Sequence, residues 1–235
     1  MIDFYGERKL SYFTTKRDSA PMTLGIHRTT PELKALKSPP EQIAGAPHDL
    51  AEKSWIFDLW AVNTTLNDAE MTVTVRCFDI ASGRVSWKKV LDKQALGSNK
   101  STELLEDCKI DDQSAVQAIM TNDQGEILAR ASDWPQPLKH VLLASTYNIK
   151  LRVMDDEVEV TTDSPVKALE LYLPDEKRQV MWEDNAIDVF PGDAYIVKAR
   201  GLRKGDEVCM RYYGIEWAPN HQHQKTRLNG HTNGH

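Results

Sequence analysis

Apolar and polar residues alternate along much of the chain, which is the period of a β-strand with one buried face. In residues 70–78, EMTVTVRCF, every second residue is apolar, from Met71 to Cys77. Residues 54–62, SWIFDLWAV, are apolar on both faces, which is typical of a central strand. The segments AVQAIM and EILARAS flank the turn sequence NDQG (122–125) and predict a hairpin.

A second series of short alternating segments runs from about residue 147 to residue 213. Its seven segments are each bounded by turn residues, for example Pro174-Asp175 and Pro191-Gly192. Seven short strands at this spacing are typical of an immunoglobulin-like β-sandwich. The pattern therefore predicts an all-β protein with two tandem immunoglobulin-like β-sandwiches.

One segment near the start follows a helical period instead. In residues 7–18, ERKLSYFTTKRD, the side chains of Leu10, Phe13 and Arg17 fall on roughly one face. Pro21 ends this segment, because the residue before a proline avoids the α region. So short a helix is unstable alone in water and must dock on another surface.

The remaining segments set the predicted domain limits. The four prolines of residues 31–50 predict a long surface loop within a first sandwich that spans residues 21–140. Pro135 and Pro137 interrupt strand pairing in residues 133–146 and mark the boundary, so the second sandwich spans residues 146–217. Residues 218–235 have almost no apolar content and are predicted to be disordered.

Composition excludes several classes of function. The net charge of -6 disfavours a nucleic-acid partner, which needs clustered positive charge. No apolar run reaches the ~20 residues of a membrane helix, and the three cysteines form neither a disulfide framework nor a zinc motif. The first residues lack the apolar stretch of a signal peptide, so we expect a cytoplasmic or otherwise intracellular protein. No motif predicts a cofactor.

An acidic cluster in residues 180–193, VMWEDNAIDVFPGD, is the first candidate site. It holds the four carboxylates Glu183, Asp184, Asp188 and Asp193. Catalysis would need two carboxylates facing one bond at roughly 5–10 Å, and a calcium site would need a DxDxDG-type spacing that is absent. Each acid lies at a turn or on the outer side of a short strand, where Asp is common. We therefore predict turn and strand-edge roles, with no catalytic residue and no metal.

The tryptophans are the second candidate. The six are Trp55, Trp60, Trp87, Trp134, Trp182 and Trp217. Exposed rings stack on sugars, whereas buried rings fill cores and domain junctions, and the second role is the commoner one. Trp134 and Trp182 lie at a linker or a strand end and are the candidates for exposure and for substrate binding.

Four stretches together resemble one family. They are IDFYGERKLSYFTTKRDSAP (2–21), ASDWPQPLKHV (131–141), MWEDNAIDVFPGD (181–193) and GLRKGDEVCMRYYG (201–214). In this order they resemble the C-terminal region of glycoside hydrolase family 2 β-mannosidases of the fungal intracellular type. The resemblance implies that residues 1–20 are a remnant of the last helix of a catalytic barrel, followed by two immunoglobulin-like domains.

The resemblance also implies a function. The family removes terminal β-linked mannose with two glutamates on barrel strands, one of which follows an asparagine. This chain has no Asn-Glu dipeptide and no repeated strand-helix alternation, so neither glutamate is carried over to it. We expect a non-catalytic accessory region that buttresses the parent's barrel, present in cis or absent. The alternatives are a carbohydrate-binding module for mannose-containing oligosaccharides and a protein-interaction or dimerisation domain.

Overall fold

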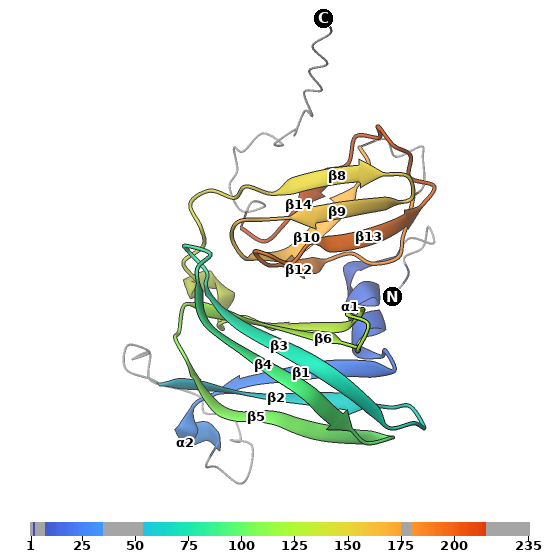
Figure 1. Ribbon diagram of the computed structural model, residues 1–235. Helices are drawn as coiled ribbons and strands as arrows, with labels where there is room; N and C mark the ends of the chain where they lie inside the picture. The colour runs from blue at the N-terminus through green and yellow to red at the C-terminus, as the bar shows by residue number, and fades with distance from the viewer. Residues whose placement is uncertain (1, 3–7, 35–53, 175–179, 215–235) are drawn as a thin grey trace, which may run out of the picture.

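The structure is a computed structural model, and it describes residue 2 and residues 8–34, 54–174 and 180–214. Figure 1 shows two β-structures, one above the other, with the helix α1 (Leu10–Asp18) beside the place where they meet. A second, short helix α2 (Pro31–Lys34) follows the first strand, and a 3-10 helix η1 (Leu138–His140) lies in the connection between the two parts. None of the described helices is long and apolar enough to span a membrane.

The first β-structure, called the first sandwich, contains seven strands in two sheets. One sheet has the order β1-β2-β5 and the other the order β4-β3-β6-β7. The strands are β1 (Met22–Thr29), β2 (Trp55–Asn63), β3 (Ala69–Asp79), β4 (Val85–Leu96), β5 (Lys100–Ile110), β6 (Ser114–Thr121) and β7 (Ile127–Asp133). All neighbours pair antiparallel.

The alternating pattern of the sequence becomes the core of the first sandwich. On β3 the side chains of Met71, Val73, Val75 and Cys77 are buried. They pack against Phe57 and other inward residues of the facing sheet in one apolar cluster. The segment 54–62 is indeed central, because β2 pairs with a strand on each side.

The strands β1 and β5, which flank β2, were not predicted from the sequence. In β1 the apolar residues Met22, Leu24 and Ile26 alternate with polar ones or glycine, so a usable signal was present. In β5 the pairing with β2 shifts register twice, between the partners of Phe57 and Trp60. A bulge inserts an extra residue and breaks the period of two, which hides the strand in the sequence.

The second β-structure, called the second sandwich, has the seven strands expected. They are β8 (Lys150–Met154), β9 (Glu157–Thr161), β10 (Val166–Tyr172), β11 (Met181–Trp182), β12 (Ile187–Val189), β13 (Tyr195–Arg200) and β14 (Cys209–Arg211). The sheets have the orders β11-β13-β9-β8 and β12-β10-β14. Their inward side chains form a second apolar cluster, which includes Val158, Leu169 and Val197. The all-β fold with two sandwiches and an N-terminal helix is confirmed.

The helix α1 docks within this chain, as expected for a helix too short to be stable alone in water. Phe13 is only 3% exposed, whereas Leu10 at the start of the helix is 41% exposed. Lys16 and Arg17 lie in the last turn, where cations interact favourably with the helix dipole.

The predicted domain limits stay predictions. Only residues 31–34 of the expected loop 31–50 are described, and they form α2. The expected disordered tail, residues 218–235, lies outside the described residues.

Candidate functional site: the junction between the two sandwiches

Polar side chains from one outer face of the first sandwich meet the second sandwich. We call the outer face of the sheet β4-β3-β6-β7 the junction face. Its residues Arg76, Gln117 and Ser132 lie side by side, because they are register partners on β3, β6 and β7. Arg130 lies two residues from Ser132 on the same face of β7 and is the register partner of Ile119. The acidic cluster of the sequence approaches these four residues.

Asp188, on the strand β12, is held by donors from both sandwiches. Its Oδ2 accepts hydrogen bonds from Ser132 Oγ at 2.6 Å and from Trp134 Nε1 at 2.8 Å, both in the first sandwich. Within the second sandwich it bonds Lys167 Nζ at 3.3 Å and the backbone N–H of Ala168 at 2.8 Å. Asp188 points outward from its strand, as predicted, but into the junction and away from solvent.

Asp193 makes the second connection. Its two oxygens accept hydrogen bonds from Arg130 Nε and Nη2, each at 2.9 Å, and Oδ2 also accepts one from Gln117 Nε2 at 2.8 Å. Burial alone would lower the pKa of Arg130, but the bonds to Asp193 raise that pKa above its ordinary value. A bidentate, mostly buried pair of this kind fixes orientation as well as contact.

A chain of hydrogen bonds continues from Asp193 to the other side of the junction. Gln117 Oε1 accepts a bond from Arg76 Nη2 at 2.6 Å, and Arg76 Nη1 donates to the carbonyl oxygen of Pro191 at 3.0 Å. Burial lowers the pKa of Arg76. The loop of residues 190–193 is therefore fixed both by the carbonyl oxygen of Pro191 and by the carboxylate of Asp193.

Phe190 fills the apolar centre of the junction. It is 1% exposed and packs with Phe78, Ile80, Ala115 and Trp134 in a cluster separate from both sandwich cores. Its ring centroid lies 5.2 Å from that of Phe78 and 5.8 Å from that of Trp134. Hydrogen-bonded polar groups surround this apolar centre, as in a stable interface, although Nε of Arg76 is buried without a hydrogen-bond partner among the described residues.

The backbones of the two sandwiches also touch at Gly83, in the turn between β3 and β4. Its φ is +70°, a conformation that favours glycine, and a Cβ added there would lie 2.3 Å from the carbonyl oxygen of Asp163. Only glycine allows so close an approach. The junction is thus tight at its edge as well as at its centre.

Arg17 of α1 binds the segment that connects β11 to β12. Its guanidinium pairs with the carboxylate of Asp184 and donates to the carbonyl oxygens of Asn185 at 2.9 Å and Ala186 at 3.1 Å. Lys16 Nζ donates to the carbonyl oxygen of Glu183 at 2.8 Å. The helix is therefore attached to the second sandwich by the carboxylate of Asp184 and by backbone carbonyl oxygens on both sides of it.

Tyr195 completes this attachment from β13. Its hydroxyl donates to Asp184 Oδ2 at 2.7 Å, and Arg130 lies over its ring at 4.4 Å from the centroid. Burial, followed by the negative charge of Asp184, raises the pKa of Tyr195 above its ordinary value. Tyr195 thus contacts both Asp184, which holds α1, and Arg130, which holds Asp193.

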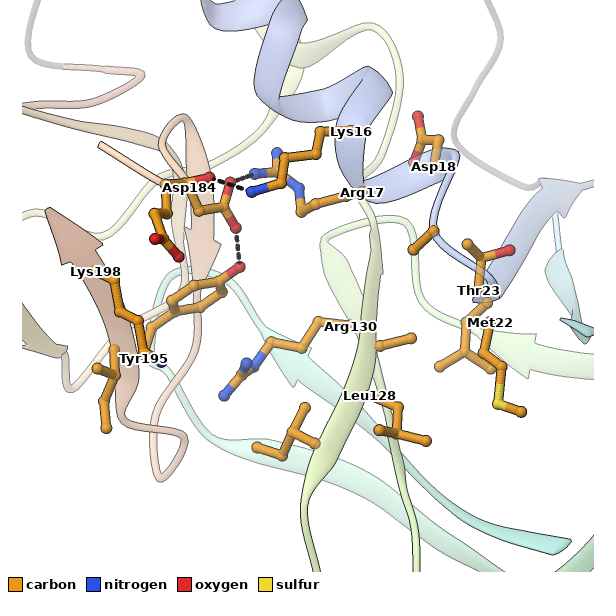
Figure 2. Close-up of a pocket in the computed structure, with 16 residues that line it drawn as sticks. Lys16, Arg17, Asp18, Met22, Thr23, Leu128, Arg130, Asp184, Tyr195 and Lys198 are labelled. Carbon is orange, nitrogen blue, oxygen red and sulfur yellow. Dashed lines mark hydrogen bonds and ion pairs between the residues drawn. The ribbon is translucent and has the colours of Figure 1, made fainter. Parts of the chain in front are cut away.

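A cavity of about 380 Å³ lies between α1, the strands β1 and β7, and the second sandwich. In Figure 2, Arg17 on the helix faces Asp184 and Tyr195, while Arg130, Leu128 and Met22 lie below the helix on strands of the first sandwich. The wall formed by β1 and β7 is mostly apolar except for Thr23 and Arg130, and the wall of the second sandwich carries charges of both signs, including Lys198 and Glu183.

The structure brings together some of the predicted site residues and separates others. Glu183 and Asp184 line the same cavity, but Asp184 is committed to Arg17 and Tyr195, and Asp188 is not among the residues that line the cavity. Within the described residues no three His, Cys, Asp or Glu side chains lie close enough to hold a metal ion. Asp188 and Asp193 connect the two sandwiches and Asp184 holds α1, roles that the prediction of turn and strand-edge positions did not include.

Of the two tryptophan candidates, Trp134 lies at the junction. The prediction that Trp134 is exposed is wrong. Its side chain is only 3% exposed, because the indole packs against Phe190 in the apolar cluster of the junction. Trp182 is partly buried against the core of the second sandwich, and its carbonyl oxygen accepts a hydrogen bond from Arg8 at 2.7 Å. That Trp182 binds substrate stays a prediction.

Part of the first sandwich is similar to a known family. Residues 56–140 match the family model described as the Mannosidase Ig/CBM-like domain. The resemblance to the family 2 β-mannosidases, inferred from four sequence stretches, is confirmed.

Relatives match almost the whole chain. It is 28% identical over 226 residues to β-mannosidase B of Thermothelomyces thermophilus, covering 92% of this chain and 25% of that protein. It is 27% identical over 223 residues to β-mannosidase B of Aspergillus niger, covering 91% of this chain and 25% of that protein. The chain spans about a quarter of the length of the curated relatives it matches.

Solved structures agree with the fold of the two sandwiches. A β-D-mannosidase from Dictyoglomus thermophilum matches with a TM-score of 0.64 at 18% identity, covering 90% of this chain and 24% of that one. The exo-chitosanase CsxA of Amycolatopsis orientalis matches with a TM-score of 0.51 at 14% identity, covering 90% and 27%. In both matches the similarity extends across both sandwiches.

Proposed function

We propose that this chain is a non-catalytic accessory region of an exo-β-mannosidase. In this proposal the parent enzyme removes terminal non-reducing β-D-mannose residues from oligosaccharides, and the two sandwiches support its catalytic barrel in cis. The similarity to β-mannosidases B over about nine tenths of the chain supports the proposal. That the protein acts inside the cell stays a prediction from the sequence.

The use of the acidic cluster is the observation that carries the proposal. Retaining glycosidases need two carboxyl groups about 5–5.5 Å apart that face the scissile bond. Here Asp188 and Asp193 are partly buried and accept hydrogen bonds from donors of the first sandwich, and Asp184 is bound by Arg17 and Tyr195. Carboxylates bound in this way are not available to protonate a leaving group or attack a sugar. The fourth acid, Glu183, is exposed, but one carboxylate alone does not form the required pair.

The attachment of α1 explains how the region could support a barrel. The helix lies in the stretch that resembles the end of a catalytic barrel, and its last turn is bound to the second sandwich through Arg17 and Lys16. A helix fixed in this way would join the barrel to the second sandwich as well as to the first. The junction would then make helix and sandwiches move as one body.

Two measurements test the proposal. The purified chain should not hydrolyse p-nitrophenyl β-D-mannopyranoside, and turnover by this chain alone would sink the non-catalytic assignment. In β-mannosidase B of Thermothelomyces thermophilus, deletion of the matched region should abolish soluble, active enzyme, and replacement of that region by this chain should restore activity. A deletion variant that kept its kcat/KM and its melting temperature would show that the region is no buttress.

A further inference from the structure

A tryptophan lies in the middle of the solvent-facing surface of the sheet β1-β2-β5. On β2 the residues Phe57, Leu59 and Ala61 point into the core, so Asp58, Trp60 and Val62 point outward. Directly opposite Trp60 lie Gly25 on β1 and Glu103 on β5. Figure 1 shows this sheet on the side of the first sandwich that faces away from the second sandwich.

The neighbouring strand leaves a place for the indole ring. A Cβ added to Gly25 would lie 2.3 Å from Cε2 of Trp60 and 2.5 Å from Nε1, closer than any real side chain is found. The ring therefore rests directly on the backbone of β1, which only glycine permits. Trp60 is held on the surface and partly exposed there.

Groups that bond hydroxyls surround the ring. Asp58 lies two positions away on the same face and is the register partner of His27, which is exposed. Lys34 Nζ at 2.9 Å and the backbone N–H of Asp107 at 2.9 Å hold the carboxylate of Asp58 in place. Glu103 on the other side of the ring is exposed.

We infer that this surface, called the Trp60 face and formed by Gly25, His27, Asp58, Trp60 and Glu103, binds an oligosaccharide of β-linked pyranose units. The C–H face of a pyranose ring packs on an aromatic ring, and its hydroxyls donate to carboxylates and bond to imidazole. The acidic flanks disfavour phosphate-bearing ligands. A neutral sugar and a cationic amino sugar share this chemistry, and the test below separates them.

The inference is independent of the proposed buttress role. The Trp60 face belongs to the sheet that does not form the junction, and none of its residues holds α1 among the described contacts. Loss of sugar binding would leave the support of a barrel untouched. Conversely, a chain that supports no barrel could still bind sugar through this face.

Titration of the full chain with β-1,4-linked mannohexaose and with the β-1,4-linked glucosamine hexamer, followed by calorimetry, tests the inference. We expect at least one of the two to bind, and Trp60→Ala to weaken that binding about tenfold, because the stacking contact is lost. Gly25→Ala leaves every polar group in place but displaces the ring, and should weaken binding as well. Trp87→Ala is the control, since Trp87 is 36% exposed on the edge strand β4, outside the Trp60 face.

The possible outcomes are distinct. Binding that falls in Trp60→Ala and Gly25→Ala and persists in Trp87→Ala supports the inference, and the preferred hexamer identifies a neutral or an amino sugar. Absence of binding by the unaltered chain to both hexamers overturns the inference. Binding that survives Trp60→Ala, in a variant whose circular dichroism and melting temperature match the original, also overturns it.

Discussion

The two outer faces of the first sandwich are built from the same alternating pattern but have different surroundings. On the junction face, Arg76, Gln117 and Arg130 bond the second sandwich and are largely shielded from water. On the Trp60 face, His27 and Glu103 are exposed to solvent. Strand alternation places a polar residue on an outer face in both cases, but it does not determine what that residue meets there.

This difference has an energetic consequence. A buried charge or apolar ring depends on its partner, whereas an exposed one can exchange its partner for water. Substitutions on the junction face should therefore be costly and should uncouple the two sandwiches. Equivalent substitutions on the Trp60 face should change stability little.

The largest effect is expected for Phe190→Ala at the centre of the junction. Removal of a fully buried ring costs about 3–5 kcal/mol, because transfer energy is lost and a cavity is left. Since Phe190 belongs to neither sandwich core, we expect thermal unfolding to separate into two transitions. Differential scanning calorimetry would show this, and a single transition of unchanged melting temperature would contradict the rigid junction.

Asp193→Asn compared with Glu103→Gln makes the contrast between the faces direct. Each substitution replaces a carboxylate by an amide of similar shape. Asp193→Asn leaves Arg130 without its buried counter-charge and should lower the free energy of unfolding by about 3 kcal/mol. Glu103→Gln on the Trp60 face should change it by less than about 0.5 kcal/mol. Urea unfolding measures both, and equal losses would remove the distinction.

Gly83→Ala tests the backbone contact at the edge of the junction, with Gly125→Ala as its control. Both glycines have positive φ, +70° and +77°, but a Cβ at Gly125 would have nothing within 4 Å. In the control, backbone strain alone should lower the free energy of unfolding by about 1 kcal/mol. Gly83→Ala should lower it further, because the carbonyl group of Asp163 must also move. Similar losses in the two variants would show that the contact at Gly83 is loose.

The smallest effect concerns alkaline pH. The pKa of Tyr195 is raised in the folded chain, first by burial and then by Asp184, so the folded state holds this proton more tightly than the unfolded state. Its contribution to stability is therefore complete below about pH 10, the ordinary tyrosine pKa, and is lost as the pH rises further. Tyr195→Phe should make the decline of melting temperature above this pH less steep. An unchanged slope would mean that Tyr195 ionises freely.

The strands and the helix could be predicted from the sequence better than the surfaces against which they pack. The sequence pattern located the strands of the second sandwich, the central strand β2 and the helix α1, because each has a regular period and turn residues at its ends. It did not identify β5, whose period is broken by register shifts against β2. It also expected Trp134 to be exposed, because position in a linker says nothing about which domain will cover the ring.

The alternation of residues and the four family-like stretches were sufficient to determine two sandwiches and their kinship with β-mannosidases. Only the tertiary structure decided what the acidic cluster does. Asp188 meets Ser132 and Trp134 across more than fifty residues of sequence, and Asp184 meets Arg17 across 167. Periodicity reports which side of a strand a residue occupies, because that depends on local backbone geometry. The partner on that side depends on how separate sheets pack, which no local pattern encodes.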